Sequence, residues 1–110
     1  MDSVAAELAD RVRALLMSEP GLEEKRMFGT RAFLLHGRIL VGVRKEGVLL
    51  VRVSEERGAE LLTEPGVSIA VMGAKTMGPS WLDVAAAATE NDESLMRWID
   101  AARESAEAKP

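Results

Sequence analysis

Apolar and polar residues alternate along two neighbouring stretches near the middle of the chain. Residues 38–43 read RILVGV and residues 48–53 read VLLVRV. In a strand, successive side chains point to opposite faces, so every second position shares one face. One face is apolar throughout on both stretches, and we expect it to lie in the core. It comprises Ile39, Val41, Val43, Leu49, Val51 and Val53.

The opposite face of the same two predicted strands mixes arginine with aliphatic residues. It comprises Arg38, Leu40, Gly42, Arg44, Val48, Leu50 and Arg52. Arginine beside apolar side chains is common at protein interfaces. A helix packed over the face, with arginine stems lying along apolar surface, explains the pattern equally well. Both interpretations stay open, and the candidate interaction face consists of Arg38, Leu40, Arg44, Leu50 and Arg52.

Two turns connect these strands to a third one, residues 31–35, and complete a central meander. His36-Gly37 is a two-residue connection with glycine second, which is typical of a hairpin turn. Residues 44–47 form a longer charged connection that ends in glycine. His36 is the only histidine, and we interpret it as a turn residue, because a metal site or a catalytic triad needs companions.

Helical spacing and capping residues predict three helices around the meander. Asp2 or Ser3 caps the first, which extends to about residue 17 or 18. Its apolar stripe is Val4, Leu8, Val12, Leu15 and Leu16. Ser54 caps a short second helix, and Asn91 is the best cap for a last helix that extends to about residue 106 with Trp98 in the core.

Two further strands are predicted between the second and the last helix, at residues 67–72 and 81–84, with residues 73–80 as the loop between them. The alanines at 85–88 favour helix by propensity, so the strand-to-loop assignment there has an alternative. The order α-β-β-β-α-β-β-α predicts an α+β fold, a mostly antiparallel sheet flanked by helices, in one domain over residues 1–110.

Charge is distributed unevenly in this acidic chain. The formal net charge is −4, but residues 25–57 hold eight basic and three acidic residues, a local charge of +5. Either the acidic helices neutralise this basic meander or it forms a basic patch that faces a partner. The net charge argues against tight unassisted binding of nucleic acid.

No pattern of catalytic or ligand-binding residues stands out. Lys75-Thr76 lacks the glycine spacing of a phosphate-binding loop, and no sequence argument brings Asp83 to these two residues. There is no cysteine. We therefore expect a protein that is no enzyme and that has no catalytic, cofactor-binding or metal-binding residues. Without an apolar run of about 18 residues or a signal core, we expect a cytoplasmic protein that is not in a membrane.

The segment KRMFG at residues 25–29, followed by FLLHGRILVGV and VLLVRV, resembles the N-terminal domain of the TfoX/Sxy family. The closing stretch at residues 92–99, with acidic residues, Leu and Trp, is similar to the end of that domain. The matching positions that look structural are Met27, Phe28, Gly29 and Gly37, with Phe28 in the core.

The resemblance implies a fold like that of small secretion-chaperone-type α+β domains, which commonly associate as dimers. Two-domain members act in DNA-uptake competence, as coactivators working with a cyclic-AMP receptor-type transcription factor, and this chain resembles a single-domain member. It implies no catalytic residue. We expect a protein-interaction module and a homodimer, with a transcription-factor partner as one candidate. The alternative is direct nucleic-acid binding through the basic meander, residues 25–57.

Overall fold

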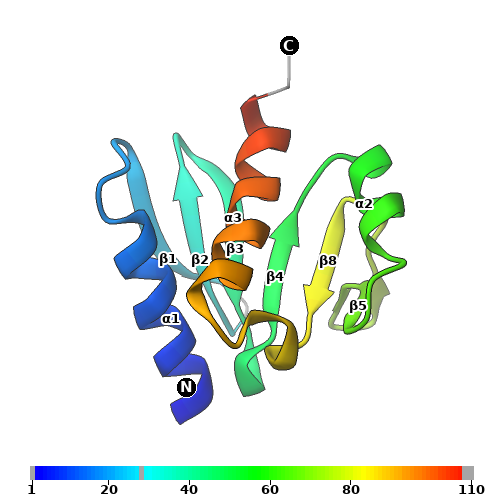
Figure 1. Ribbon diagram of the computed structural model, residues 1–110, viewed down its shortest axis with the longest axis horizontal. Coiled ribbons are helices and arrows are strands. Elements are labelled where there is room, and N and C mark those ends of the chain that lie inside the picture. Colours follow the sequence, from blue (N-terminus) through cyan, green and yellow to red (C-terminus); the bar gives the residue numbers. More distant parts are fainter. Residues whose placement is uncertain (1, 28, 108–110) are drawn as a thin grey trace.

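The computed structural model describes residues 2–27 and 29–107 (Figure 1). The helices are α1 (Ser3–Leu16), α2 (Glu55–Leu61) and α3 (Asp92–Glu107), and two short 3-10 segments are η1 (Lys45–Gly47) and η2 (Ala86–Thr89). The strands are β1 (Leu22–Met27), β2 (Thr30–Leu35), β3 (Arg38–Val43), β4 (Leu49–Arg52), β5 (Val67–Ile69), β6 (Val71–Met72), β7 (Lys75–Thr76) and β8 (Trp81–Val84).

Six of these strands form one sheet, in the order β1-β2-β3-β4-β8-β5. Every neighbouring pair in it is antiparallel. Helices α1 and α3 lie on the same face of this sheet (Figure 1). The predicted α+β class, a mostly antiparallel sheet flanked by helices, is confirmed.

Two predictions about strands were wrong. The meander has a fourth strand, because β1 pairs along its whole length with β2. Its sequence, LEEKRM, is mostly charged, so no apolar alternation marks it. The strand predicted at residues 67–72 is divided at Ala70, whose N–H donates to Trp81 O while its carbonyl accepts from Met77 N. β6 then leaves the main sheet and pairs with β7.

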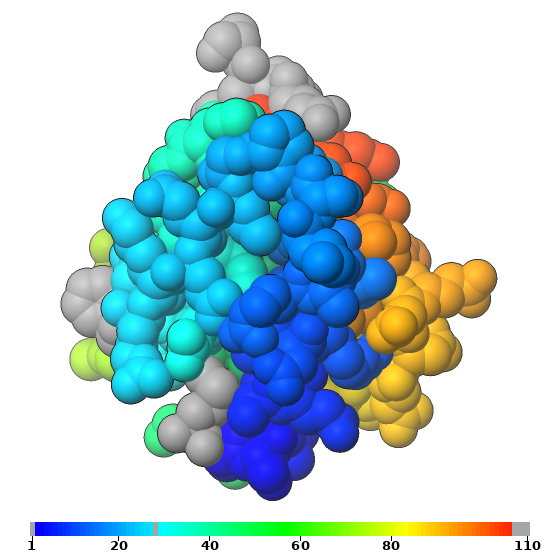
Figure 2. Space-filling view, turned by 90° about the vertical axis from the view of Figure 1, so that its left-hand side faces the viewer, coloured from blue at the N-terminus to red at the C-terminus, as the bar shows by residue number. Residues whose placement is uncertain are grey.

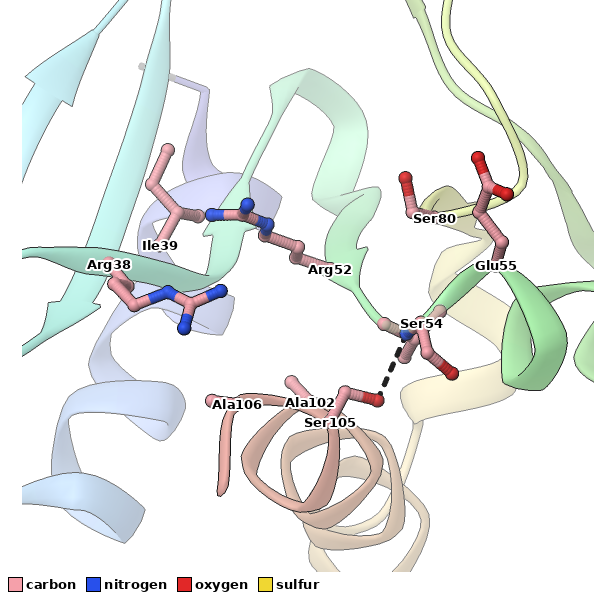
Figure 3. Close-up of a pocket in the computed structure, with 10 residues that line it drawn as sticks. Arg38, Ile39, Arg52, Ser54, Glu55, Ser80, Ala102, Ser105 and Ala106 are labelled. Atoms are coloured by element: carbon pink, nitrogen blue, oxygen red, sulfur yellow. Dashed lines mark hydrogen bonds between the residues drawn. The ribbon is translucent and has the colours of Figure 1, made fainter. Parts of the chain in front are cut away.

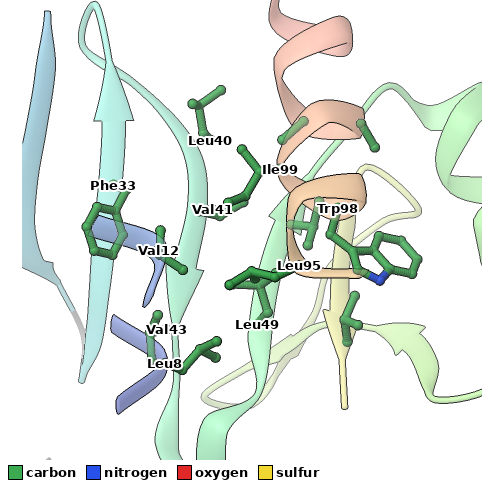
Figure 4. Close-up of a cluster of buried hydrophobic side chains, with 14 of the residues drawn as sticks. Leu8, Val12, Phe33, Leu40, Val41, Val43, Leu49, Leu95, Trp98 and Ile99 are labelled. Atoms are coloured by element: carbon green, nitrogen blue, oxygen red, sulfur yellow. The ribbon is translucent and has the colours of Figure 1, made fainter. Parts of the chain in front are cut away.

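The core lies between the helices and one face of the sheet (Figure 4). Leu8, Val12 and Leu16 of α1 and Leu95, Trp98 and Ile99 of α3 are buried there. The sheet contributes Phe33, Val41, Val43, Leu49, Val51, Val53, Leu82 and Val84. Trp98 is thus a core residue, as predicted, whereas Val4 of the predicted stripe is 52% exposed.

A bulge in β3 corrects the predicted division of its side chains between faces. Phe33 pairs with Val41 but Leu34 pairs with Ile39, so β3 has one extra residue at this point. An extra residue moves every side chain beyond it to the other face. Leu40 therefore belongs to the helix-covered core, at 1% exposure, and Ile39 leaves that face. Arg38, which pairs with Leu35, lies on the helix side.

Turns and caps follow the local chemistry of the sequence. His36 (φ 53°) and Gly37 (φ 80°) both adopt the left-handed conformation, which confirms the hairpin turn. The side chains of Asp2, Ser54 and Asn91 accept hydrogen bonds from the first turns of α1, α2 and α3. None of the helices in the described part of the chain has the length and hydropathy needed to cross a membrane.

Candidate functional site

Arg44 fixes the sheet to the hairpin formed by β6 and β7. Its Nη1 donates to both carboxylate oxygens of Asp83 at 2.8 Å, and its Nη2 donates to Val71 O at 2.8 Å. The Arg44 and Asp83 side chains are only 22% and 21% exposed. The guanidinium group is therefore committed to contacts within the chain, and we assign Arg44 a structural role rather than a contact with a partner.

The two leucines of the candidate interaction face lie inside the molecule. Leu40 packs in the helix-covered core, and Leu50, on the opposite face of the sheet, is 2% exposed. Neither offers contact area to a partner in the conformation described. The predicted group of five residues is thus not one continuous surface, and Arg38 and Arg52 are its accessible members.

Arg52 lies over an aromatic ring on the face of the sheet opposite α1 and α3. It pairs with Trp81 across β4 and β8, and its guanidinium carbon is 5.1 Å from the centre of the indole ring. A cation over an indole is held by the ring's negative face. Both side chains are half-buried, and within the described residues no carboxylate pairs with Arg52. The sequence did not predict this pair, because only the strand order brings residue 81 beside residue 52.

A cavity opens where β3 and β4 diverge (Figure 3). The ladder between the strands reaches only to the pair Val41–Val51, because the bulge turns the start of β3 away from β4. The cavity has a volume of about 340 Å³. Its lining comes from β3, the end of β4, the start of α2, the residue before β8 and the last turns of α3: Arg38, Ile39, Arg52, Val53, Ser54, Glu55, Ser80, Ala102, Ser105 and Ala106.

The eight basic residues of the meander are only partly neutralised. Arg31 pairs with Glu24, Arg44 with Asp83, and Arg57 with Glu60. The other five have no ion pair within residues 2–27 and 29–107: Lys25, Arg26, Arg38, Lys45 and Arg52. The chain's own carboxylates therefore neutralise part of the meander, as one of the two interpretations predicts, and leave its other five basic residues without an ion pair in the described part of the chain.

A charged cluster on the helix side joins α1 to the sheet. Arg13 of α1 donates from Nε and Nη2 to the two carboxylate oxygens of Glu24 at 2.8 and 2.7 Å, and Arg31 donates from Nη1 at 3.1 Å. The hydrogen bonds from Arg13 are the main cause that lowers the pKa of Glu24, and burial opposes them. Glu24 raises the pKa of Arg13 in turn.

The residues predicted to be structural lie at turns. Met27 ends β1 and pairs with Thr30, Gly29 has φ 76° in the turn between them, and Gly37 has φ 80°. Phe28 lies outside the described residues. The two glycines occupy conformations that residues with a Cβ rarely adopt.

The residues considered for chemistry are not brought together as a reactive group. Lys75 and Thr76 are exposed on β7, whereas Asp83 is held by Arg44. In residues 2–27 and 29–107, no group of three or more His, Asp or Glu side chains is placed to hold a metal ion.

Comparison with known proteins gives one result. The family model described as the TfoX N-terminal domain matches residues 14–106. No curated protein and no solved structure matches the chain. The match covers most of the 110 residues and includes every strand of the sheet as well as α2 and most of α3. The chain therefore belongs to the TfoX N-terminal domain family.

Proposed function

We propose that this domain is a cytoplasmic, non-enzymatic protein-interaction module that acts in transcription regulation through a protein partner. The observation that carries the proposal is the half-exposed pair of Arg52 and Trp81 on the sheet face opposite α1 and α3. The regulatory part rests on the resemblance to family members that act in competence together with a transcription factor. The interaction part rests on the residues themselves.

Arginine and tryptophan are the residues that most often dominate binding energy at protein interfaces. The indole of Trp81 offers a large rigid surface, and its stacking already orders the guanidinium of Arg52. Ordering before binding lowers the entropy that a complex must give up. Ile39, half-buried on the same face after the bulge, adds an aliphatic contact near Arg52 (Figure 3).

The charge of this surface indicates the chemistry of the partner. Arg52 has no carboxylate partner in the described part of the chain, and it lies at the end of β4, where this strand diverges from β3. Arg52 complements an acidic side chain, and Ile39 and Trp81 complement apolar ones. The partner we propose is a protein segment that presents acidic residues beside an apolar anchor.

We also propose a homodimer, formed at the free edge of β1 so that the face with Trp81 stays open. β1 is an edge strand of the sheet, next to α1 on the molecular surface (Figure 2). Antiparallel pairing of two copies centred on Glu24 places the exposed Glu23 of one copy opposite the exposed Lys25 of the other. Opposite charges at the two positions beside the centre favour this register, and the two facing Glu24 carboxylates are each bound by Arg13 and Arg31 of their own copy.

A photo-crosslinking experiment tests the partner site. Benzoylphenylalanine replaces Ile39, and the cross-linked proteins from native cytosol are identified by mass spectrometry. We expect one predominant adduct with an acidic surface segment, and we expect R52E and W81A to remove it. R57E is the matched control, since Arg57 pairs with Glu60 on α2. An adduct that persists in both R52E and W81A, or one formed only with a second copy of the chain, contradicts the proposed face.

Light scattering tests the dimer. We expect the unaltered chain to be a dimer, K25E to be a monomer because it places two acidic residues opposite each other, and the charge-swapped pair E23K with K25E to be a dimer again. If K25E and the charge-swapped variant have the same mass as the unaltered chain, β1 is not the contact. Direct nucleic-acid binding through residues 25–57 remains the alternative function.

A further inference from the structure

The hairpin formed by β6 and β7 begins and ends beside Trp81. Ala70 connects it to the sheet, because the Ala70 N–H donates to Trp81 O at 2.9 Å and the Ala70 carbonyl accepts from Met77 N at 2.9 Å. Trp81 N in turn donates to Gly78 O at 3.0 Å. The base of the hairpin is therefore attached to the backbone of a residue that we assign to the partner face.

Arg44 holds the hairpin against this face of the sheet. Its Nη2 donates to Val71 O at 2.8 Å, while its Nη1 binds Asp83. Arg44 follows β3 and Asp83 belongs to β8, so their ion pair crosses over β4, which lies between these strands (Figure 1). Within residues 2–27 and 29–107, the bond to Val71 O is the only side-chain hydrogen bond that joins residues 71–77 to the rest of the chain.

Leu50 of β4 lies beside this crossing. It pairs with Gly42 of β3 on one side and with Asp83 of β8 on the other. Leu50 is only 2% exposed, although it does not belong to the core that α1 and α3 cover. Its burial therefore comes from groups on the opposite face of the sheet, where the Arg44 side chain crosses β4 and holds the hairpin.

The hairpin itself has little to keep it in place. Each of its strands has two residues, and a two-stranded hairpin on its own is only marginally stable in water. Lys75 and Thr76 are exposed, and Val71 is 48% exposed, so these residues bury little apolar surface. Segments with few buried apolar contacts open at a much lower free energy than the core does.

We propose that the hairpin is a hinged cover, which swings about Ala70 and Met77 and exposes Leu50 to the partner protein. This inference rests on the proposed partner site at Arg52 and Trp81. Leu50 is the diagonal neighbour of Trp81 across β4 and β8, so in the open state it extends the apolar part of that site. A partner that contacts Leu50 binds the open state alone, and the closed hairpin lowers its apparent affinity.

Thiol labelling of two single-cysteine variants tests the cover without a partner. The chain has no cysteine, so L50C and V51C each carry one reactive group. The two positions are adjacent on β4 but face opposite sides of the sheet, and Val51 is fully buried in the helix-covered core. We expect L50C to be labelled at least about tenfold faster than V51C, because V51C is labelled only when the core opens.

Urea distinguishes the two kinds of opening. A swinging hairpin exposes little surface, so the labelling rate of L50C should rise only slightly with urea, whereas that of V51C should rise as steeply as global unfolding does. Equal labelling rates for the two variants, or an equally steep dependence on urea, would show that Leu50 is exposed only by unfolding and would overturn the proposal.

R44K tests whether Arg44 is the latch. Lysine keeps a positive charge opposite Asp83 but lacks the planar fork that reaches Val71 O at the same time. The labelling rate of L50C, relative to V51C in the same background, should rise by roughly tenfold, as expected for the loss of a hydrogen bond from a charged group. R57K is the matched control, since it makes the same exchange in the ion pair with Glu60 on α2. A relative rate that R44K leaves unchanged overturns the latch.

The photo-crosslinking adduct at position 39 tests the link to the partner. A tenfold larger open fraction raises the apparent affinity of the partner about tenfold, so R44K should increase the adduct yield at low concentrations of the chain. R57K should not. Faster labelling of L50C with an unchanged adduct yield overturns the regulatory role of the hairpin. If the unaltered chain forms no adduct, the partner site is overturned and this role with it, whereas the labelling rates still decide whether the hairpin opens.

Discussion

Gly58 of α2 lies directly against the carbonyl group of Pro79. A Cβ atom on residue 58 would be 1.7 Å from Pro79 O and 2.7 Å from its carbonyl carbon. A glycine inside a helix costs stability in isolation. Here its missing side chain lets α2 approach the segment that leads into β8, and this approach positions Ser54 and Ser80 at the cavity.

We expect G58A to be strongly destabilising, because the added methyl group meets backbone atoms that cannot move without shifting α2 or the loop before β8. The free energy of unfolding should fall by about 3 kcal/mol, at the upper end of ordinary overpacking. The melting temperature should fall by roughly 15 °C, given about 4–8 °C per kcal/mol in a domain of this size. Thermal unfolding followed by circular dichroism measures both.

The matched control is G78A. Gly78 lies in the same loop, one residue before Pro79, and a Cβ there has no heavy atom within 4 Å. Its φ is not in the left-handed region, so alanine is compatible with the backbone. The substitution should change stability by less than about 0.5 kcal/mol, as exposed changes usually do. Equal melting temperatures for G58A and G78A would show that the contact with Pro79 does not constrain the fold.

The ion pair between Arg44 and Asp83 should stabilise the sheet more than an exposed pair does. Both side chains are about four-fifths buried, and both carboxylate oxygens of Asp83 accept hydrogen bonds from Arg44 Nη1. We expect D83N to cost about 1.5–3 kcal/mol, the range for hydrogen bonds to charged groups. For the exposed pair of Arg57 and Glu60, E60Q should cost under about 1 kcal/mol.

A double-mutant cycle in urea separates the interaction from other effects of substitution. R44M, D83N and the double variant should show a coupling energy of about 1 kcal/mol or more. Additive effects within about 0.3 kcal/mol would mean that Arg44 is held by its bond to Val71 O rather than by Asp83.

Much of this fold could be predicted from local sequence, and the candidate site could not. The caps at Ser54 and Asn91 and the turn at His36-Gly37 depend on chemistry within a few residues and were predicted correctly, and Asp2 is one of the two caps predicted for the first helix. β1 was missed because an edge strand can carry charge on both faces. Its identity as a strand comes from pairing with β2.

The candidate site depends on contacts between distant residues, which the alternation of apolar and polar positions does not predict. One extra residue in β3 exchanges Leu40 with Ile39 and separates Arg38 from the face predicted for it. The stacking of Arg52 on Trp81 depends on β8 lying next to β4 in the sheet. The two residues are 29 positions apart in the sequence. Ser105 joins the cavity only because α3 packs back over the sheet. Such contacts follow from topology rather than from neighbouring residues.

The cluster around Glu24 predicts an acid-dependent loss of stability. Hydrogen bonds from Arg13, with a smaller contribution from Arg31, lower the pKa of Glu24 in the folded chain. In the unfolded chain this pKa is about 4.3. A lowered pKa in the folded state means that the contribution to stability is fully present above that value and is lost as the pH falls through the folded-state pKa.

We therefore expect E24Q to be less stable than the unaltered chain at pH 7, by about 1 kcal/mol for a half-exposed pair. The difference should shrink as the pH falls below about 4, where the carboxylate of the unaltered chain becomes protonated. Urea unfolding between pH 7 and 3 measures it. E23Q is the matched control, because Glu23 is the exposed neighbour on β1 and should show no such dependence on pH. A difference for E24Q that is constant over this range would contradict the assignment.

The last prediction separates the partner-protein function from direct nucleic-acid binding. Three of the eight basic residues of the meander are paired with carboxylates, and the chain as a whole carries a net charge of −4. We expect labelled duplex and single-stranded oligonucleotides to bind more weakly than about 10⁻⁴ M at physiological salt, the weak end of non-specific binding. Fluorescence anisotropy over a range of salt concentrations measures this. Tighter binding whose affinity falls steeply with salt, and which the exposed-site variants K25E and K45E weaken, would favour the nucleic-acid function. Because W81A leaves the charge of the meander unchanged, it should spare binding to phosphates and disrupt only a protein complex. Its effect therefore assigns any complex that is found to one of the two functions.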